Sequence, residues 1–163
     1  MHRTRLLGAI GVSLCSAVVA WGHPPASGDL SGPLRAHLQN ERFTVITSIR
    51  GLPLGVREEL EPLFGGSLDI AEPKADFQRT DVRGNAQLPN RRLIAAGCSA
   101  DFHCLVHYER GGIAHSWYVM LFQWTPSATR FEWGGAAPGA LATIEEVQKA
   151  VVSGVIKRNA GPW

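Results

Sequence analysis

The N-terminal segment constrains this chain most, because its composition is that of an export signal and an export signal sets the compartment in which the rest must fold. Arg3 and Arg5 make a basic start, followed by an apolar run over residues 6–20 that is too short to span a bilayer. Ala20-Trp21-Gly22 then has the small-x-small pattern of a cleavage site. We therefore predict a signal peptide over residues 1–22, and a mature protein that is periplasmic or extracellular with no stable membrane span.

The charge of the chain argues against nucleic acid as a partner. The formal net charge is +2, and removal of Arg3 and Arg5 with the signal brings it to zero. Beyond the signal, basic residues gather only in short pairs such as Arg91-Arg92 and Lys157-Arg158. Nucleic acid binding depends on a concentrated basic surface, which these pairs do not provide.

The length left after residue 22 suits one domain with a single hydrophobic core. Residues 23–40 begin with Pro, Gly, Ser and Ala in no apolar period, which predicts a flexible N-terminal lead-in. We expect one α+β domain over residues 41–158 and a C-terminal tail over residues 159–163.

Alternating apolar residues predict a series of antiparallel strands. Residues 42–49 alternate with the period of two that is typical of a strand. Later β-branched and aromatic runs are joined by a polar loop and by Gly111-Gly112, which predicts a meander with a two-residue turn at the glycines. The predicted strands of this meander are 91–98, 104–109, 113–124 and 129–133, with short extended pieces at 68–71 and 77–82 and a flexible stretch at 134–140.

Two segments have the spacing of helices. After Pro53, apolar residues recur three to four positions apart, which predicts a short helix that ends or kinks near Pro62. Thr143 and Glu146 form a capping box, which predicts a second helix. Its apolar stripe is Ile144, Val147, Val151 and Val155. The predicted fold class is α+β: an antiparallel meander sheet with a short helix after the first strand and a C-terminal helix packed on the sheet.

Cys98 and Cys104 are the only cysteines beyond the signal, and they flank one short loop. In antiparallel strands the two ends of such a loop lie opposite each other, within the reach of a disulfide. An oxidising compartment favours that bond, so we predict a structural disulfide between them. A redox-active pair is disfavoured, because such pairs are typical of a CxxC motif at a helix N-terminus.

The histidines are candidate metal ligands, but their spacing matches no common ligand pattern. His103, His107 and His115 lie near the cysteines, yet a two-residue turn at Gly111-Gly112 would place His107 and His115 on opposite faces of the sheet. His23, at the expected mature N-terminus, could begin a copper-binding brace, but it lies in a segment predicted to be flexible. We therefore predict no metal site. If one did form, these four histidines would be its candidate ligands. We also predict no cofactor, since the sequence has no phosphate-binding glycine loop and no dinucleotide fingerprint.

The strand over residues 113–124 is apolar on both faces, which indicates that core, ligand or partner covers each side. Trp117, Tyr118, Trp124 and Trp133 would suit an aromatic binding surface. We therefore predict a binding module rather than a catalyst, with a small apolar ligand or another protein as its partner.

An enzymatic alternative rests on the histidines. Ser99, Asp101 and His103 lie in one loop, too close in sequence to form the ordered relay of a serine hydrolase. The alternative that stays open is a small metal-dependent or hydrolytic enzyme that uses His103, His107 or His115.

Overall fold

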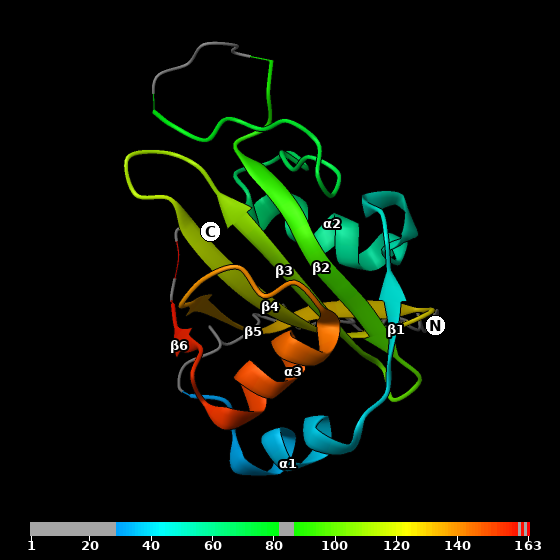
Figure 1. Ribbon diagram of the computed structural model, residues 1–163. Helices are drawn as coiled ribbons and strands as arrows, with labels where there is room; N and C mark the ends of the chain where they lie inside the picture. The colour runs from blue at the N-terminus through cyan, green and yellow to red at the C-terminus, as the bar shows by residue number, and fades with distance from the viewer. Residues whose placement is uncertain (1–28, 82–86, 160, 162) are drawn as a thin grey trace, which may run out of the picture.

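The computed structural model describes residues 29–81, 87–159, 161 and 163, and its centre is one antiparallel sheet (Figure 1). Within these residues six strands follow one another in chain order, each paired with the next. The strands are β1 (Phe43–Ile46), β2 (Arg91–Ser99), β3 (His103–Arg110), β4 (Ser116–Thr125), β5 (Ala128–Ala137) and β6 (Lys157–Arg158). The predicted antiparallel meander is confirmed.

Helices cover both faces of the sheet. The helices α1 (Gly32–Asn40) and α3 (Ile144–Ser153) pack together on one face, and α2 (Leu54–Leu63) packs on the other, against β4 and β5 (Figure 1). A single 3-10 turn, η1 (Ile49–Gly51), lies between β1 and α2. We call the two sides of the sheet the α1/α3 face and the α2 face. The predicted α+β class, with a short early helix and a C-terminal helix on the sheet, is confirmed.

The two hydrophobic cores follow from the alternation of side chains along the strands. On the α1/α3 face, Leu105 of β3 packs in one core with Leu38 of α1 and Val147 of α3. On the α2 face, the next residue of β3, Val106, packs with Val56 of α2. Because both faces are covered, the central strands are apolar on both sides.

Helix α3 begins and ends as its sequence predicts. The Thr143 hydroxyl accepts a hydrogen bond from the Glu146 N–H at 3.2 Å, which satisfies one of the free donors at the helix start. Gly154 ends the helix with a φ of 76°, in the left-handed region that glycine adopts readily. Val155, predicted as part of the apolar stripe, lies beyond this end and is 50% exposed.

The connection between β3 and β4 is longer than predicted. The ladder ends with Arg110 opposite Ser116, so residues 111–115 form the loop. The two-residue turn predicted at Gly111-Gly112 is therefore wrong; it would have placed His107 opposite Ser116, whereas His107 lies opposite Val119. The longer loop bonds to neighbouring segments: the Gly111 N–H donates to the Asn90 carbonyl at 3.0 Å, and His115 Nε2 lies 2.7 Å from Glu109 Oε2.

Residues 32–40, predicted as part of a flexible lead-in, form helix α1 instead. The Ser31 hydroxyl caps the helix by accepting a hydrogen bond from the Leu34 N–H, and Leu38 is fully buried. Pro33 fits at the helix start because a first-turn N–H has no partner within the helix. Residues 23–28 of the predicted lead-in lie outside the described residues.

Three further segments differ from the predictions. Residues 68–81 form no strand, and Ala71 makes only a single parallel bridge to β2. Strand β5 continues to Ala137, so much of the stretch predicted to be flexible is paired with β4. Trp163, predicted to lie in a tail, is buried against Tyr118 on the α2 face, where its ring fills the core.

The predicted signal peptide, its cleavage site and His23 lie in residues 1–28, outside the described residues. Within the part of the chain that the structure describes, no helix is both long enough and apolar enough to cross a membrane.

Candidate metal centre

Glu41 lies where α1 ends, and helix α3 holds its backbone there. The side-chain amide of Gln148 donates to the carbonyl oxygens of Leu38 and Glu41, at 2.7 and 2.9 Å. The Leu38 carbonyl also accepts the backbone N–H of Glu41 at 3.4 Å, so Gln148 adds a second bond at the helix end, where carbonyls lack their usual helical partners. Gln148 therefore fixes the point from which the Glu41 carboxylate enters the protein.

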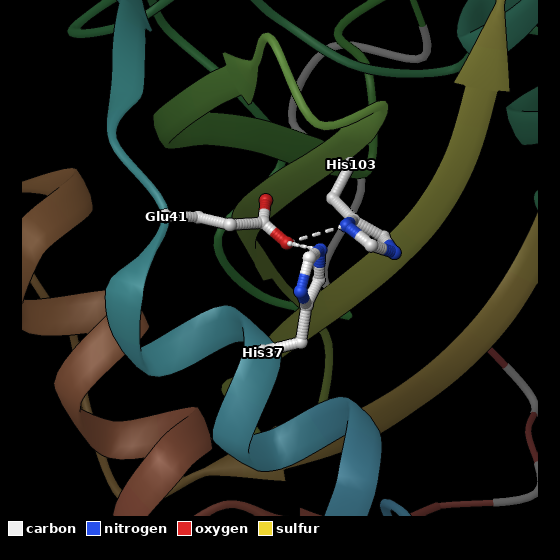
Figure 2. A group of neighbouring side chains, drawn as sticks. All are labelled: His37, Glu41 and His103. Atoms are coloured by element: carbon white, nitrogen blue, oxygen red, sulfur yellow. Dashed lines mark hydrogen bonds and ion pairs between the residues drawn. The ribbon is translucent and has the colours of Figure 1, made fainter.

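Two histidines converge on the Glu41 carboxylate (Figure 2). His37 lies one helical turn earlier on the same side of α1, and its Nε2 is 3.1 Å from Glu41 Oε1. His103, the first residue of β3, places its Nδ1 2.6 Å from the same oxygen. The side chains of Glu41 and His103 are only 1% and 8% exposed, whereas that of His37 is 54% exposed. The cluster is thus buried on the sheet side and open to solvent at His37.

Residues at the β2–β3 loop support this cluster. Ser99, the last residue of β2, donates its hydroxyl hydrogen to Glu41 Oε2 at 2.5 Å and accepts the backbone N–H of His103 at 3.2 Å. The predicted disulfide is confirmed: Cys98 and Cys104 are bonded across directly opposite positions of β2 and β3. This bond closes the loop that carries Ser99 and His103.

The donor atoms have the number, type and spacing of a transition-metal site. Two imidazole nitrogens and one carboxylate oxygen, from His37, His103 and Glu41, lie within 4.8 Å of one another. A tetrahedral Zn²⁺ with bonds of about 2.0–2.1 Å separates its ligands by roughly 3.3 Å. Glu41 Oε1 lies 3.1 and 2.6 Å from the two nitrogens, both shorter than this value, so the side chains would move apart to admit the ion.

The Glu41 carboxylate differs from most buried carboxylates in what it bonds to. Among the described residues, the Glu41 carboxylate bonds to two histidines and to Ser99, and no lysine or arginine bonds to it. Burial of an ionised carboxylate costs several kcal/mol unless a positive charge offsets it. A divalent cation held by the three side chains would supply that charge.

His115 belongs to a different cluster, near the other end of β3. Its Nε2 is 2.7 Å from Glu109 Oε2, and its ring stacks on Trp117 with the ring centroids 4.7 Å apart. The other oxygen, Glu109 Oε1, accepts from Arg92 Nε at 2.7 Å and lies 2.5 Å from Arg92 Nη2. The guanidinium already neutralises this carboxylate, so the Glu109 cluster has no deficit of positive charge.

His107 is a structural residue of the core. It is 0% exposed, with Nδ1 2.9 Å from the carbonyl oxygen of Tyr118 and Nε2 3.0 Å from the backbone N of Leu141. Because a carbonyl only accepts and a backbone N–H only donates, Nδ1 carries the hydrogen and the ring is neutral. Burial lowers the pKa of His107, which keeps it neutral. Both nitrogens are committed, so neither is free to bind a metal.

The four aromatic residues predicted to line a binding surface do not share one face. Trp117 and Trp133 pack with the core of the α1/α3 face, whereas Tyr118 and Trp124 pack with that of the α2 face. Strand alternation causes the division, because Trp117 and Tyr118 are neighbours in β4. Trp133 is also only 5% exposed. These residues therefore stabilise two cores.

Apolar surface occurs instead in a groove beside the edge strand β1. The groove has a volume of about 520 Å³, and Ile46, Ile94 and Ile144 are among its lining residues, together with Lys74 and Glu145. It lies between β1, β2 and the start of α3. This is a place that an apolar ligand could occupy, distinct from the predicted aromatic face.

The sequence prediction identified His103 but missed His37 and Glu41. These two residues are four positions apart, a spacing that places them on one side of a helix. The signal was hidden because the segment was predicted to be a lead-in without helical structure.

No family model matches the chain, and searches of curated proteins and of solved structures likewise give no match. The case for a metal centre therefore depends on the geometry and charge of the cluster itself.

Proposed function

We propose that this protein is an exported domain that binds a divalent transition-metal ion, with Zn²⁺ the best match, through His37 Nε2, Glu41 Oε1 and His103 Nδ1. The observation that carries the proposal is a buried carboxylate on which two imidazoles converge, with no permanent cation bonded to it in the described residues. Binding requires the two coordinating nitrogens to be free of hydrogen. Ser99 would keep its bond to Glu41 Oε2 and orient the carboxylate, as groups behind metal ligands commonly do.

The donor set supports zinc. Imidazole nitrogen and carboxylate oxygen are both ordinary zinc ligands, and two histidines with one glutamate form a known donor set that leaves a fourth position open. The exposed side of His37 is where water, an anion or a group from another molecule would complete the coordination. The proposal keeps the predicted class of a binding domain and names a metal ion, rather than an apolar ligand, as the bound species. A disulfide agrees with export to an oxidising compartment.

The test is isothermal titration calorimetry of the untagged, chelator-treated full chain with zinc sulfate, beside two matched variants. His37→Ala removes one ligand from a surface position, and His115→Ala removes the corresponding partly exposed histidine of the Glu109 cluster. We expect the wild type and His115→Ala to bind one Zn²⁺ with equal affinity. His37→Ala should bind more than about 100-fold more weakly, since even changes behind the ligands cost about 10–100-fold.

His23→Ala belongs in the same series, because a histidine outside the described residues could bind zinc independently. The zinc affinity of His23→Ala should equal that of the wild type. The proposal fails if the wild type does not bind zinc, or if His37→Ala binds as tightly as the wild type.

A further inference from the structure

The Cys98–Cys104 disulfide is placed where it can control the proposed metal centre. The two cysteines are 6 residues apart, and the loop between them begins with Ser99 and ends with His103. Ser99 bonds to one oxygen of Glu41 and His103 to the other. These two contacts of the carboxylate therefore come from residues that directly adjoin a disulfide cysteine.

The sulfur atoms lie on the opposite side of the sheet from the metal centre. Cys98 and Cys104 pack with the core of the α2 face. His103, one position before Cys104 in β3, points toward α1 on the other face. Free thiols could not join the metal ligands unless the strand turned over. The disulfide thus acts on the centre by positioning the backbone of its neighbours.

The loop that the disulfide closes has an unfavourable backbone conformation. Phe102 has a φ of 67°, in the left-handed region that is uncommon for residues with a side chain. Its carbonyl oxygen accepts the N–H of Trp124 at 2.9 Å, which helps to hold it there. Phe102 directly precedes His103, so the conformation of this loop and the position of His103 are linked.

We infer that the redox state of Cys98 and Cys104 sets the metal affinity of the centre, an inference that rests on the proposed function. The oxidised form holds Ser99 and His103 in position around Glu41. Reduction to two thiols frees the loop and weakens metal binding about tenfold, the lower end of the effect of groups that orient metal ligands.

The redox step needs a dithiol reductant. One thiolate of the reductant attacks a cysteine sulfur, which forms a mixed disulfide and releases the other cysteine as a thiol. The second thiol of the reductant then closes the reductant's own disulfide and releases the remaining cysteine. Two electrons and two protons pass to the protein, and the reductant is oxidised.

Linkage makes the effect reciprocal. If reduction weakens zinc binding tenfold, bound zinc stabilises the disulfide against reduction by the same factor. For a two-electron couple, a tenfold change corresponds to a reduction potential about 30 mV more negative. The disulfide and the bound ion therefore stabilise each other.

The first experiment compares zinc affinity in the oxidised full chain and in the double variant Cys98→Ala/Cys104→Ala. Alanine is used because free thiols bind zinc themselves. Val106→Ala is the matched control, since it removes apolar atoms from the same α2-face core and leaves the disulfide intact. We expect about tenfold weaker binding in the double variant and unchanged binding in the control, with circular dichroism showing that all three are folded.

The outcomes separate the two proposals. Equal affinity in the oxidised protein and the double variant overturns this inference and leaves the proposed function standing, whereas no binding by the oxidised protein overturns both. If the double variant does not fold, a second measurement replaces it: the reduction potential of the Cys98–Cys104 disulfide in the wild type, in glutathione buffers with and without buffered free zinc. Because zinc also binds the reduced cysteines, the quantity compared is the zinc-dependent shift in the wild type minus that in His37→Ala. A difference of about 30 mV toward more negative potential supports the inference, and equal shifts in the two proteins overturn it.

Discussion

Two buried glutamates lie near opposite ends of β3, and each bonds to histidine, but they differ in what balances their charge. Glu109 bonds to Arg92 as well as to His115. Glu41 bonds to histidines and Ser99, and it has no arginine or lysine bonded to it in the described part of the chain. The side chain of Glu41 is also the more buried, at 1% against 8% exposed. A histidine beside a carboxylate is therefore weak evidence of a metal site; a missing cation beside a buried carboxylate is stronger evidence.

The largest expected effect comes from removing the cation of the Glu109 cluster. Arg92→Gln leaves Glu109 buried without its guanidinium and also removes the contact of Arg92 with the Phe77 ring, 4.6 Å away. Breaking a buried ion pair from one side costs about 3–5 kcal/mol, and we expect a loss near the lower figure because Arg92 is partly exposed. Urea denaturation of metal-free protein measures the free energy of unfolding.

Arg130→Gln is the control for this prediction. Arg130 lies 3.6 Å from Glu132, and its side chain is 53% exposed, so its loss should cost less than about 1 kcal/mol. A loss below about 1 kcal/mol for Arg92→Gln as well would mean that His115 alone balances Glu109, and the contrast between the two clusters would disappear.

His107 lies between the two clusters on the same side of β3, and it predicts a pH dependence of stability. Its pKa is lowered by burial, whereas in the unfolded chain it has the ordinary value of about 6.5. Below that pH the unfolded state binds a proton that the folded state does not. The contribution of neutral His107 to the free energy of unfolding is therefore complete above about pH 6.5. It decreases as the pH falls toward the lowered pKa, by up to about 1.4 kcal/mol per pH unit.

Urea denaturation at pH 7.5 and pH 5.0 tests this sign. His107→Gln should lose about 1–2 kcal/mol at pH 7.5, since the N–H of Leu141 or the carbonyl of Tyr118 loses its partner. The further loss between the two pH values should be smaller in His107→Gln than in the wild type. An identical pH dependence in wild type and His107→Gln would show that the folded protein tolerates a protonated His107.

Local patterns in the sequence predicted those parts of the fold that depend on near neighbours. The capping residues Thr143 and Glu146 identified α3, and the spacing of Cys98 and Cys104 around one loop identified the disulfide. Each of these features forms between residues a few positions apart, so a short stretch of sequence contains all the information.

The Glu41 cluster could not be predicted in the same way, because it depends on tertiary contacts. Glu41 meets His103 only after β1 pairs with β2 and Gln148 fixes the end of α1. The assumed turn at Gly111-Gly112 likewise misplaced His115, since loop length was judged from the glycines alone. Two causes therefore hid the cluster: the helix that aligns His37 with Glu41 was not predicted, and His103 lies far from both in sequence.

The smallest expected effect, that of Glu41→Gln, is the sharpest test of the comparison. The amide has the size of the carboxylate and can still accept a hydrogen bond from Ser99, but it carries no charge. In chelator-treated protein, the bonds lost to the histidines are offset by the removal of a buried charge, so we expect the free energy of unfolding to change by less than about 1 kcal/mol in urea denaturation. Arg92→Gln and Glu41→Gln would then differ because only the Glu109 cluster holds its own cation. A loss of about 3 kcal/mol in Glu41→Gln would instead mean that a protonated His37 or His103 already supplies the positive charge, and that the Glu41 cluster is an ion-pair network with no place for a metal ion.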